Sequence, residues 1–156
     1  MENLQKLKTN KQHAGFIGHS YLGSWVNLGA DTNCSDLKNN YSTVKVQLNG
    51  KSVDSGSQFL GVMMGDHSKT GINTMFNTGT VVGYSCNIFG AGFPDKYLPC
   101  FSWGGSESLS TYELAKSVAT AKIVMNRRNE KLLPANEKLF ENLFNLTSEE
   151  RNGQRN

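Results

Sequence analysis

The sequence has few cysteines and prolines, and glycine almost disappears from its last third. Three cysteines occur among 156 residues, an odd number without paired spacing, together with three prolines. This use of cysteine favours a reduced, cytoplasmic protein over a disulfide-stapled secreted domain. Fifteen of the sixteen glycines lie at or before Gly105, which predicts a boundary there between a glycine-rich part and a helical part.

An excess of one charge sign and long apolar runs are also missing. The net charge is +3, and basic and acidic residues are mixed along the chain. We expect no nucleic-acid partner, because such binding needs a basic stripe or patch. No apolar run approaches membrane-spanning length, and the first residues, MENLQKLKTNKQ, lack the apolar segment of a signal peptide. We therefore expect no membrane partner either.

The chain does contain a six-residue rhythm from Met64 to Phe93. It reads MGDHSK, TGINTM, FNTGTV, VGYSCN and IFGAGF. The first position of each hexad is bulky and apolar except at Thr70, and the fifth position is always small. This period fits neither an α-helix nor a flat strand. It is typical of a parallel β-helix, in which three hexads form one triangular coil and the first and fifth positions face its interior.

The same rhythm is predicted for the whole of residues 10–93, with one interruption. In the earlier part the first position holds Phe16, Leu22 and Leu28, and the fifth holds Ala14, Ser20, Val26 and Thr32. The phase breaks over residues 34–57, where Asn49-Gly50 between two alternating runs predicts a β-hairpin. A long ordered loop on a rigid scaffold is a frequent place for function.

Helices are predicted after the repeat. Residues 94–109 read as an irregular connection, 110–147 as helices, and residues 1–9 and 148–156 as tails. Ser110 and Glu113 have the spacing of a capping box, and a second helix is predicted to begin near Pro134. Two apolar stripes are expected to pack on the repeat or on a neighbouring subunit and to cover one end of it. They comprise Leu114, Val118, Ala121 and Met125, and Leu139, Phe140, Leu143 and Phe144.

Two stretches resemble a known family. KQHAGFIGHSYLGSWVNLGADT and MGDHSKTGINTMFNTGTVVGYSCNIFGAG are similar to the C-terminal half of bifunctional sugar-1-phosphate nucleotidyltransferase/acetyltransferases. The loop LKNNYSTVKVQLNGKSVDSGSQFLG is most similar to their archaeal branch. The resemblance covers about residues 11–93. It implies an all-β solenoid, namely a left-handed parallel β-helix of hexapeptide repeats with a loop insertion and C-terminal α-helices. It also implies a homotrimer with active sites between subunits.

The resemblance implies acetyl transfer from acetyl-CoA to the amine of a hexosamine 1-phosphate, a small-molecule sugar phosphate. Such a reaction needs a general base, hydrogen-bond donors for the oxyanion, and groups that hold the phosphate. Residues 1–15 contain no glycine-rich phosphate loop, so nucleotidyl transfer is not expected from this chain. We expect the chain to be the back part of a longer protein, or a chain whose lower end meets another domain.

The family's functional positions are carried over through this resemblance. His13 falls on the catalytic base. The implied substrate contacts are Phe16, Asn27, Asp36 and Lys45, and the implied CoA contacts are Ala30, Ile72 and Gly90. Three positions depart from the family, since Phe16 lacks a tyrosine hydroxyl, Asp36 replaces an asparagine and Ser42 replaces a lysine. A carboxylate at Asp36 would repel a sugar phosphate unless it is paired.

These departures leave a second function open, a non-catalytic trimerisation or regulatory scaffold of a sugar nucleotidyltransferase. His19, six residues after His13, is expected to stack one face away, where it could be mistaken for the base. His67 is expected to face outward and to bond Asp66 in a turn. A zinc hydratase would need histidines from adjacent coils, two of them five apart. His13, His19 and His67 lack this spacing, so no metal is expected.

Overall fold

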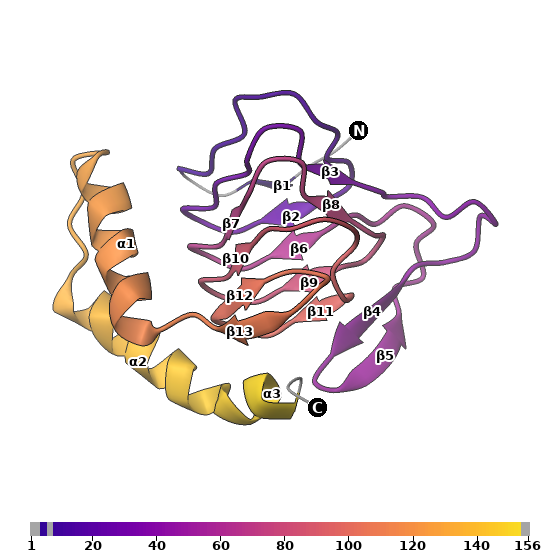
Figure 1. The fold of residues 1–156 in the computed structure, drawn as a ribbon. Helices are drawn as coiled ribbons and strands as arrows, with labels where there is room; N and C mark the ends of the chain where they lie inside the picture. The colour runs from indigo at the N-terminus through magenta and orange to yellow at the C-terminus, as the bar shows by residue number, and fades with distance from the viewer. Residues whose placement is uncertain (1–3, 6–7, 154–156) are drawn as a thin grey trace.

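The computed structural model describes residues 4–5 and 8–153. It is rich in very short strands and ends in three helices (Figure 1). The strands are β1 (Leu4–Gln5), β2 (Tyr21–Leu22), β3 (Asn33–Cys34), β4 (Lys45–Leu48), β5 (Lys51–Asp54), β6 (Met63–Met64), β7 (Lys69–Thr70), β8 (Met75–Phe76), β9 (Val81–Val82), β10 (Asn87–Ile88), β11 (Tyr97–Leu98), β12 (Ser102–Gly104) and β13 (Leu109–Thr111). The helices are α1 (Leu114–Asn126), α2 (Pro134–Leu146) and α3 (Ser148–Gly153).

Most strands stack in parallel, one coil above another (Figure 1). One sheet has the order β1-β2-β6-β9-β11, a second joins β7, β10 and β12 and ends in the antiparallel strand β13, and a third pairs β3 with β8. Met63 pairs with Val81, eighteen residues later. Tyr21 pairs with Met63 across one such repeat plus the 24 residues of the insertion. The arrangement is compatible with the predicted β-helix.

The first position of the hexads faces the interior of the stack, as predicted. Its buried residues form one continuous core: Leu22, Leu28, Cys34, Met64, Phe76, Val82 and Ile88. Thr70, the polar exception, is also buried, and its hydroxyl lies 2.7 Å from that of Thr32 and accepts a hydrogen bond from the amide of Gly29. A buried hydroxyl is tolerated when it is bonded in this way. Two predicted interior positions, Ala14 and Gly92, are instead exposed.

The first coil departs from the predicted phase by one residue. Ile17 occupies the interior with 8% of its surface exposed, whereas Phe16, predicted to face inward, is 42% exposed. The reason is a shorter coil, because Asn10 pairs with Asn27 and Ile17 with Cys34, both seventeen residues apart. An eighteen-residue count therefore selects the wrong member of the Phe16–Ile17 pair.

The insertion forms the predicted hairpin, which projects from the stack (Figure 1). Asn49 and Gly50 both have positive φ, as a tight two-residue turn between antiparallel strands requires. Val44 and Val46 are buried and hold the base of the hairpin against the coils. Gly79, with φ of 64°, makes room for them, since a Cβ there would lie 2.6 Å from Val44. The insertion is thus anchored at its base.

Successive coils share a left-handed backbone at one corner, here called the helix-side corner. Its members are Lys8, Trp25, His67, Ser85 and Phe101, with φ between 53° and 65°. This conformation costs a residue with a side chain about 1–2 kcal/mol. A backbone ladder offsets the cost, because the amide of His67 donates to Ser24 and that of Ser85 donates to Asp66, both at 2.9 Å.

Helices α1 and α2 cover the helix-side corner. Phe140 of α2 is fully buried, with its ring centroid 5.1 Å from that of His67 and 4.9 Å from that of Tyr84. Ser117 of α1 bonds the hydroxyl of Ser85 at 2.6 Å. The predicted start of the second helix at Pro134 is confirmed. The predicted bond of His67 to Asp66 is wrong, because the carboxylate accepts from the amide of Ser24. Among the described residues, Nδ1 of the buried imidazole has no hydrogen-bond partner.

Two further expectations at the C-terminal end are wrong. Ser110 does not begin a helix, because residues 109–111 pair with β12, and α1 starts at Leu114 without a side-chain cap. Residues 148–153, expected in a tail, form α3 below the last coils (Figure 1). Arg151 is buried there, donates to the carbonyl of Cys100 and lies 4.3 Å from the ring centroid of Phe144. None of the helices described has the length and hydrophobicity that crossing a bilayer requires.

Candidate functional site

His13 lies in an exposed segment of the first coil. The ammonium of Lys11 donates to the carbonyls of His13 and Ala14, both at 2.9 Å, and so fixes this segment locally. Within the described part of the chain, no hydrogen bond or ring contact occupies the imidazole of His13. Its side chain is therefore accessible to a ligand, as a base that acts on a bound substrate must be.

His19 and Asp36 form a pair that the sequence did not predict. Nδ1 of His19 lies 2.7 Å from Oδ2 of Asp36, and the two side chains are 32% and 13% exposed. When a carboxylate accepts from Nδ1–H, the tautomer is fixed and Nε2 carries the lone pair. This pair can therefore act as an oriented general base. The pairing also reduces the expected repulsion between Asp36 and a sugar phosphate, because the carboxylate already has a partner.

Two aromatic rings flank this pair. The ring of Phe59 is centred 5.1 Å from the imidazole of His19. The ring of Phe16 and the carboxylate of Asp36 both lie close to Gly18. A Cβ added to Gly18 would lie 2.8 Å from the ring of Phe16 and closer still to the carboxylate of Asp36. Both rings are exposed to solvent. The structure thus brings together two of the predicted substrate contacts, Phe16 and Asp36, and adds His19 and Phe59 to them.

The other two predicted substrate contacts lie apart from this cluster. Asn27 accepts from the side chain of Asn10 at 3.3 Å and lines a cavity beside α1 that includes none of His13, Phe16 or Asp36. Lys45 is exposed on the hairpin, opposite Asp54. Hydrogen bonds from the Gly56 amide and the Thr43 hydroxyl lower the pKa of Asp54. Among the described residues, no hydrogen bond or ion pair joins Lys45 to the cluster.

The predicted CoA contacts line a second corner, here called the open corner. The amide of Asn73 donates to the carbonyl of Ala30 at 2.8 Å, so Ile72 and Ala30 lie in adjacent coils. A Cβ on Gly71 would lie 3.0 Å from Cβ of Phe89, which places residues 89–90 in the next coil. Ile72 is 69% exposed, and a Cβ added to Gly90 would point into open space. The structure therefore brings Ala30, Ile72 and Gly90 into one row, in which Ile72 and Gly90 are exposed and Ala30 is half-buried.

The thiols and the other histidine are placed for packing. Cys34 and Cys86 are buried, and burial raises the pKa of each thiol to about 12, which excludes a thiolate nucleophile near neutral pH. His67 lies between Trp25, Tyr84 and Phe140, whereas His19 contacts Asp36 and Phe59. In the described ranges, no three histidine, cysteine or acidic side chains converge as a metal site would require.

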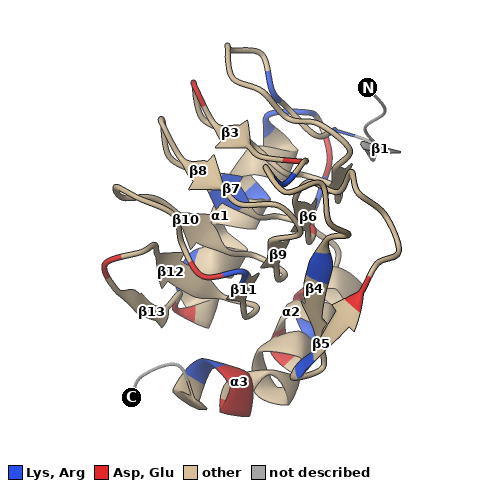
Figure 2. Cartoon of the chain, turned by 90° about the vertical axis from the view of Figure 1, so that its right-hand side faces the viewer, with Lys and Arg blue, Asp and Glu red and all other residues tan. Residues whose placement is uncertain are grey.

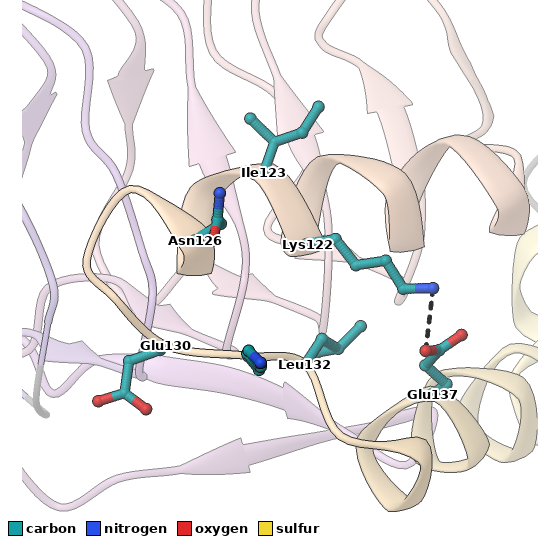
Figure 3. Close-up of a pocket in the computed structure, with 7 residues that line it drawn as sticks. Lys122, Ile123, Asn126, Glu130, Leu132 and Glu137 are labelled. Carbon is teal, nitrogen blue, oxygen red and sulfur yellow. Dashed lines mark ion pairs between the residues drawn. The ribbon is translucent and has the colours of Figure 1, made fainter.

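A separate cavity of about 450 Å³ lies among the C-terminal turn of α1, the α1–α2 connection and α2 (Figure 3). Lys122 reaches across from α1 and pairs with Glu137 of α2 at 2.9 Å. Leu132 and Ile123 provide part of its lining. Carboxylates and cations occur together there, and none of the predicted site residues lines it. The cavity belongs to the helix pair.

The missed pair has a signal in the sequence. His19 and Asp36 are seventeen residues apart, which equals the spacing of the paired residues Ile17 and Cys34 in the same coils. Once the length of the first coil is known, the two side chains are expected to stack. With the predicted eighteen-residue coil, Asp36 would be paired with Gly18 instead.

Comparisons with known proteins give a partial match. No protein-family model matches this chain. It is 35% identical over 77 residues to the bifunctional sugar-1-phosphate nucleotidylyltransferase/acetyltransferase of Sulfurisphaera tokodaii, covering 49% of this chain. It is 39% identical over 80 residues to the bifunctional protein GlmU of Methanocaldococcus jannaschii and 35% over 83 residues to that of Methanococcus maripaludis, covering 51% and 53% of this chain. The matches span 19–20% of each relative and lie in its C-terminal region.

Proposed function

We propose that this chain is an acetyl-CoA-dependent N-acetyltransferase module that acts on a hexosamine 1-phosphate. The observation that carries the proposal is the similarity of about half the chain to proteins named as sugar-1-phosphate nucleotidylyltransferase/acetyltransferases. The stacked parallel strands support it, because they suit a left-handed parallel β-helix. The chain has no glycine-rich phosphate loop in residues 1–15, so the nucleotidyl-transfer activity of such relatives is not assigned to it.

The proposed reaction uses the exposed base of the first coil. His13 takes a proton from the substrate amine as the amine nitrogen attacks the thioester carbonyl of acetyl-CoA. A C–N bond forms, the C–S bond breaks, and the CoA sulfur leaves and is protonated. Ala30, Ile72 and Gly90 hold acetyl-CoA along the open corner, and Phe16 and Asp36 contact the sugar phosphate. Asn27 and Lys45, the other two proposed substrate contacts, lie apart from them within one chain. His19, oriented by Asp36, is the competing base.

We further propose that the active module is a homotrimer. Large apolar side chains remain exposed along the coils, and a neighbouring subunit would cover them. They are Phe16, Ile72, Phe89 and Phe93. Exposed apolar side chains of this size favour a partner if they form one patch in the assembly. Within one chain, Lys45 lies apart from the cluster of Phe16, His19 and Asp36. In a trimer, the hairpin of a neighbouring subunit would supply Lys45 to that cluster. The three free cysteines favour a reducing compartment such as the cytoplasm.

Two observations favour the alternative, a non-catalytic trimerisation or regulatory scaffold. The carboxylate of Asp36 is already held by His19, and the ring of Phe16 carries no hydroxyl for the substrate. A site that has lost two substrate contacts in this way can persist as a binding or assembly surface without turnover. The two functions differ in whether a thiol is released.

The test is thiol release by the purified full chain from acetyl-CoA and glucosamine 1-phosphate. We expect turnover by the native chain, a loss of about 100-fold or more in His13→Ala, and a smaller loss in His19→Ala. Lys116→Ala, on the exposed face of α1, is the matched control and keeps full activity. Absence of thiol release from a folded native chain refutes the enzyme and leaves the scaffold. A larger loss in His19→Ala than in His13→Ala reassigns the base.

A further inference from the structure

A cavity of about 700 Å³ lies between α1 and the helix-side corner. Four of its lining residues are cationic, namely Lys8, Lys69, Arg127 and Arg128, and none is acidic. Lys69 comes from β7, and the two arginines follow the last turn of α1. Elsewhere the charges of both signs are distributed over coils, hairpin and helices (Figure 2). The concentration of positive charge in this cavity is therefore a local feature.

Three of the four cations have no counter-ion in the described structure. Lys8 pairs with Glu130, which leaves Lys69, Arg127 and Arg128. The ammonium of Lys69 donates to the carbonyl of His67 at 2.8 Å, a neutral acceptor. Within residues 4–5 and 8–153, no ion pair joins any of these three to a carboxylate. The C-terminal end of α1 contributes only about half a negative charge, so the cavity keeps a net positive charge.

At Lys69, the charged form of the side chain is destabilised by burial in the cavity wall without a counter-ion. Burial lowers the pKa of its ammonium to about 8. An anion placed beside it would favour the charged form and restore part of the lost stabilisation. The remaining polar groups of the wall are neutral, including the side chains of Asn10 and Asn27. Trp25 closes one side, and the ammonium of Lys8 lies 5.1 Å from the centroid of its ring.

We propose that this cavity binds the pyrophosphate group of a small phosphorylated molecule. Two guanidinium groups can bind phosphate oxygens in a bidentate manner, and Lys69 adds a point charge from the opposite wall. The volume is in the range of sites that hold small-molecule ligands. Of the residues proposed for acetyl transfer, only Asn27 lines the cavity. The inference does not depend on the proposed acetyltransferase activity, although the two sites share Asn27.

A structural role is the competing explanation for the same cations. Arg127 is the C-cap residue of α1, where a positive charge stabilises the helix end without any ligand. That explanation accounts for Arg127, but it does not explain why Lys69 of β7 lies opposite without a counter-ion. The two explanations differ in whether the three cations act on one ligand.

The experiment is calorimetric titration of the full chain with inorganic pyrophosphate as the probe, with sulfate at matched ionic strength as the comparison. We expect saturable binding of pyrophosphate to the native chain, at least tenfold tighter than binding of sulfate. The variant Arg127→Gln/Arg128→Gln and the variant Lys69→Met are each expected to weaken it at least tenfold. Lys69→Arg keeps the charge and is expected to retain binding within about threefold.

Lys116→Gln is the matched control. Lys116 is exposed on α1, pairs with Glu113 and does not line the cavity, so its removal is expected to change pyrophosphate affinity less than twofold. Equal weakening in Lys116→Gln and in Arg127→Gln/Arg128→Gln overturns the proposal, because it indicates non-specific attraction. Absence of pyrophosphate binding to the native chain, or binding unaffected by the arginine and Lys69 variants, also overturns it. Acetyl-CoA takes no part in these titrations, so their failure is distinct from failure of acetyl transfer.

Discussion

The helix-side corner and the open corner share a left-handed backbone, but their side chains differ in burial. His67 at the first and Asn73 at the second both have a left-handed backbone, with φ of 62° and 58°. At the first corner two helices cover the side chains, and burial lowers the pKa of His67 to about 4. At the second corner Asn73 and its neighbour Ile72 are exposed. The coil geometry is shared, and the difference is that helices bury His67 at the first corner, whereas Ile72 and Asn73 stay exposed at the second.

The largest expected effect comes from removing the ring that seals the helix-side corner. Phe140→Ala is expected to lower the free energy of unfolding by about 3–5 kcal/mol, because the fully buried ring packs against His67, Tyr84 and Phe101. Urea denaturation measures the change. Leu139→Ala, the adjacent position with 45% exposure, is the control and is expected to cost under about 1 kcal/mol. Equal costs would mean that α2 does not stabilise the corner.

A pH-dependent loss of stability is expected from His67. Its pKa is about 4 in the folded chain, mainly through burial and secondarily through the nearby charge of Lys69, against 6.5 in the unfolded chain. The unfolded chain therefore binds a proton that the folded chain does not between these values, and stability falls as the pH drops from 6.5 to 4. The total amounts to about 3 kcal/mol.

Unfolding free energies of the native chain and of His67→Leu, measured from pH 7 to pH 4, isolate this contribution. The difference between the two proteins is expected to change by about 3 kcal/mol over that interval. His13→Leu, at an exposed position, is expected to follow the native chain. An unchanged difference between the native chain and His67→Leu across the interval would show that the imidazole of residue 67 is not buried.

Away from the helices, a smaller effect is expected from the pair of His19 and Asp36. A double-mutant cycle with His19→Ala and Asp36→Ala is expected to give a coupling energy of about 1 kcal/mol, since the carboxylate is mostly buried. The Lys116–Glu113 pair, in which both side chains are about two-thirds exposed, serves as the control with about 0.3 kcal/mol. Coupling no larger than in the control pair would remove the argument for an oriented base.

The smallest effect is expected at the open corner itself. Asn73→Gly is expected to be neutral within about 0.5 kcal/mol, because glycine accepts the left-handed backbone and the side chain is exposed. Asn73→Ala is expected to cost slightly more than Asn73→Gly, since alanine pays for its Cβ in this conformation. Thermal unfolding orders the three proteins. If alanine were the better replacement, the left-handed conformation at residue 73 would be incorrect.

Much of the fold could be predicted from local repetition. The hexads fixed which side chains face the interior between Met64 and Ile88, and Asn49-Gly50 marked the hairpin. Tertiary contacts decided the rest. Ser110 carries a helix-start pattern, yet it pairs with Trp103 of β12. The order of α3 depends on Arg151 reaching Cys100 and Phe144, contacts that no periodic pattern encodes.

The candidate site could be predicted only in those coils whose length could be predicted from the sequence. The row of Ala30, Ile72 and Gly90 follows from a regular repeat interrupted by one insertion, and the structure aligns it. The pairing of His19 with Asp36 depends on a first coil one residue shorter than the others. Since Phe16 and Ile17 are both apolar, the sequence gives no reason to prefer the shorter count.

Hydrogen exchange of the full chain with and without acetyl-CoA tests the distinction between the two corners most directly. Slower exchange is expected in residues 70–76 and 88–93 of the open corner when acetyl-CoA is present, with no change in residues 134–146 of α2. Protection confined to α1 and α2, or no protection anywhere, would contradict the assignment of ligand binding to the open corner.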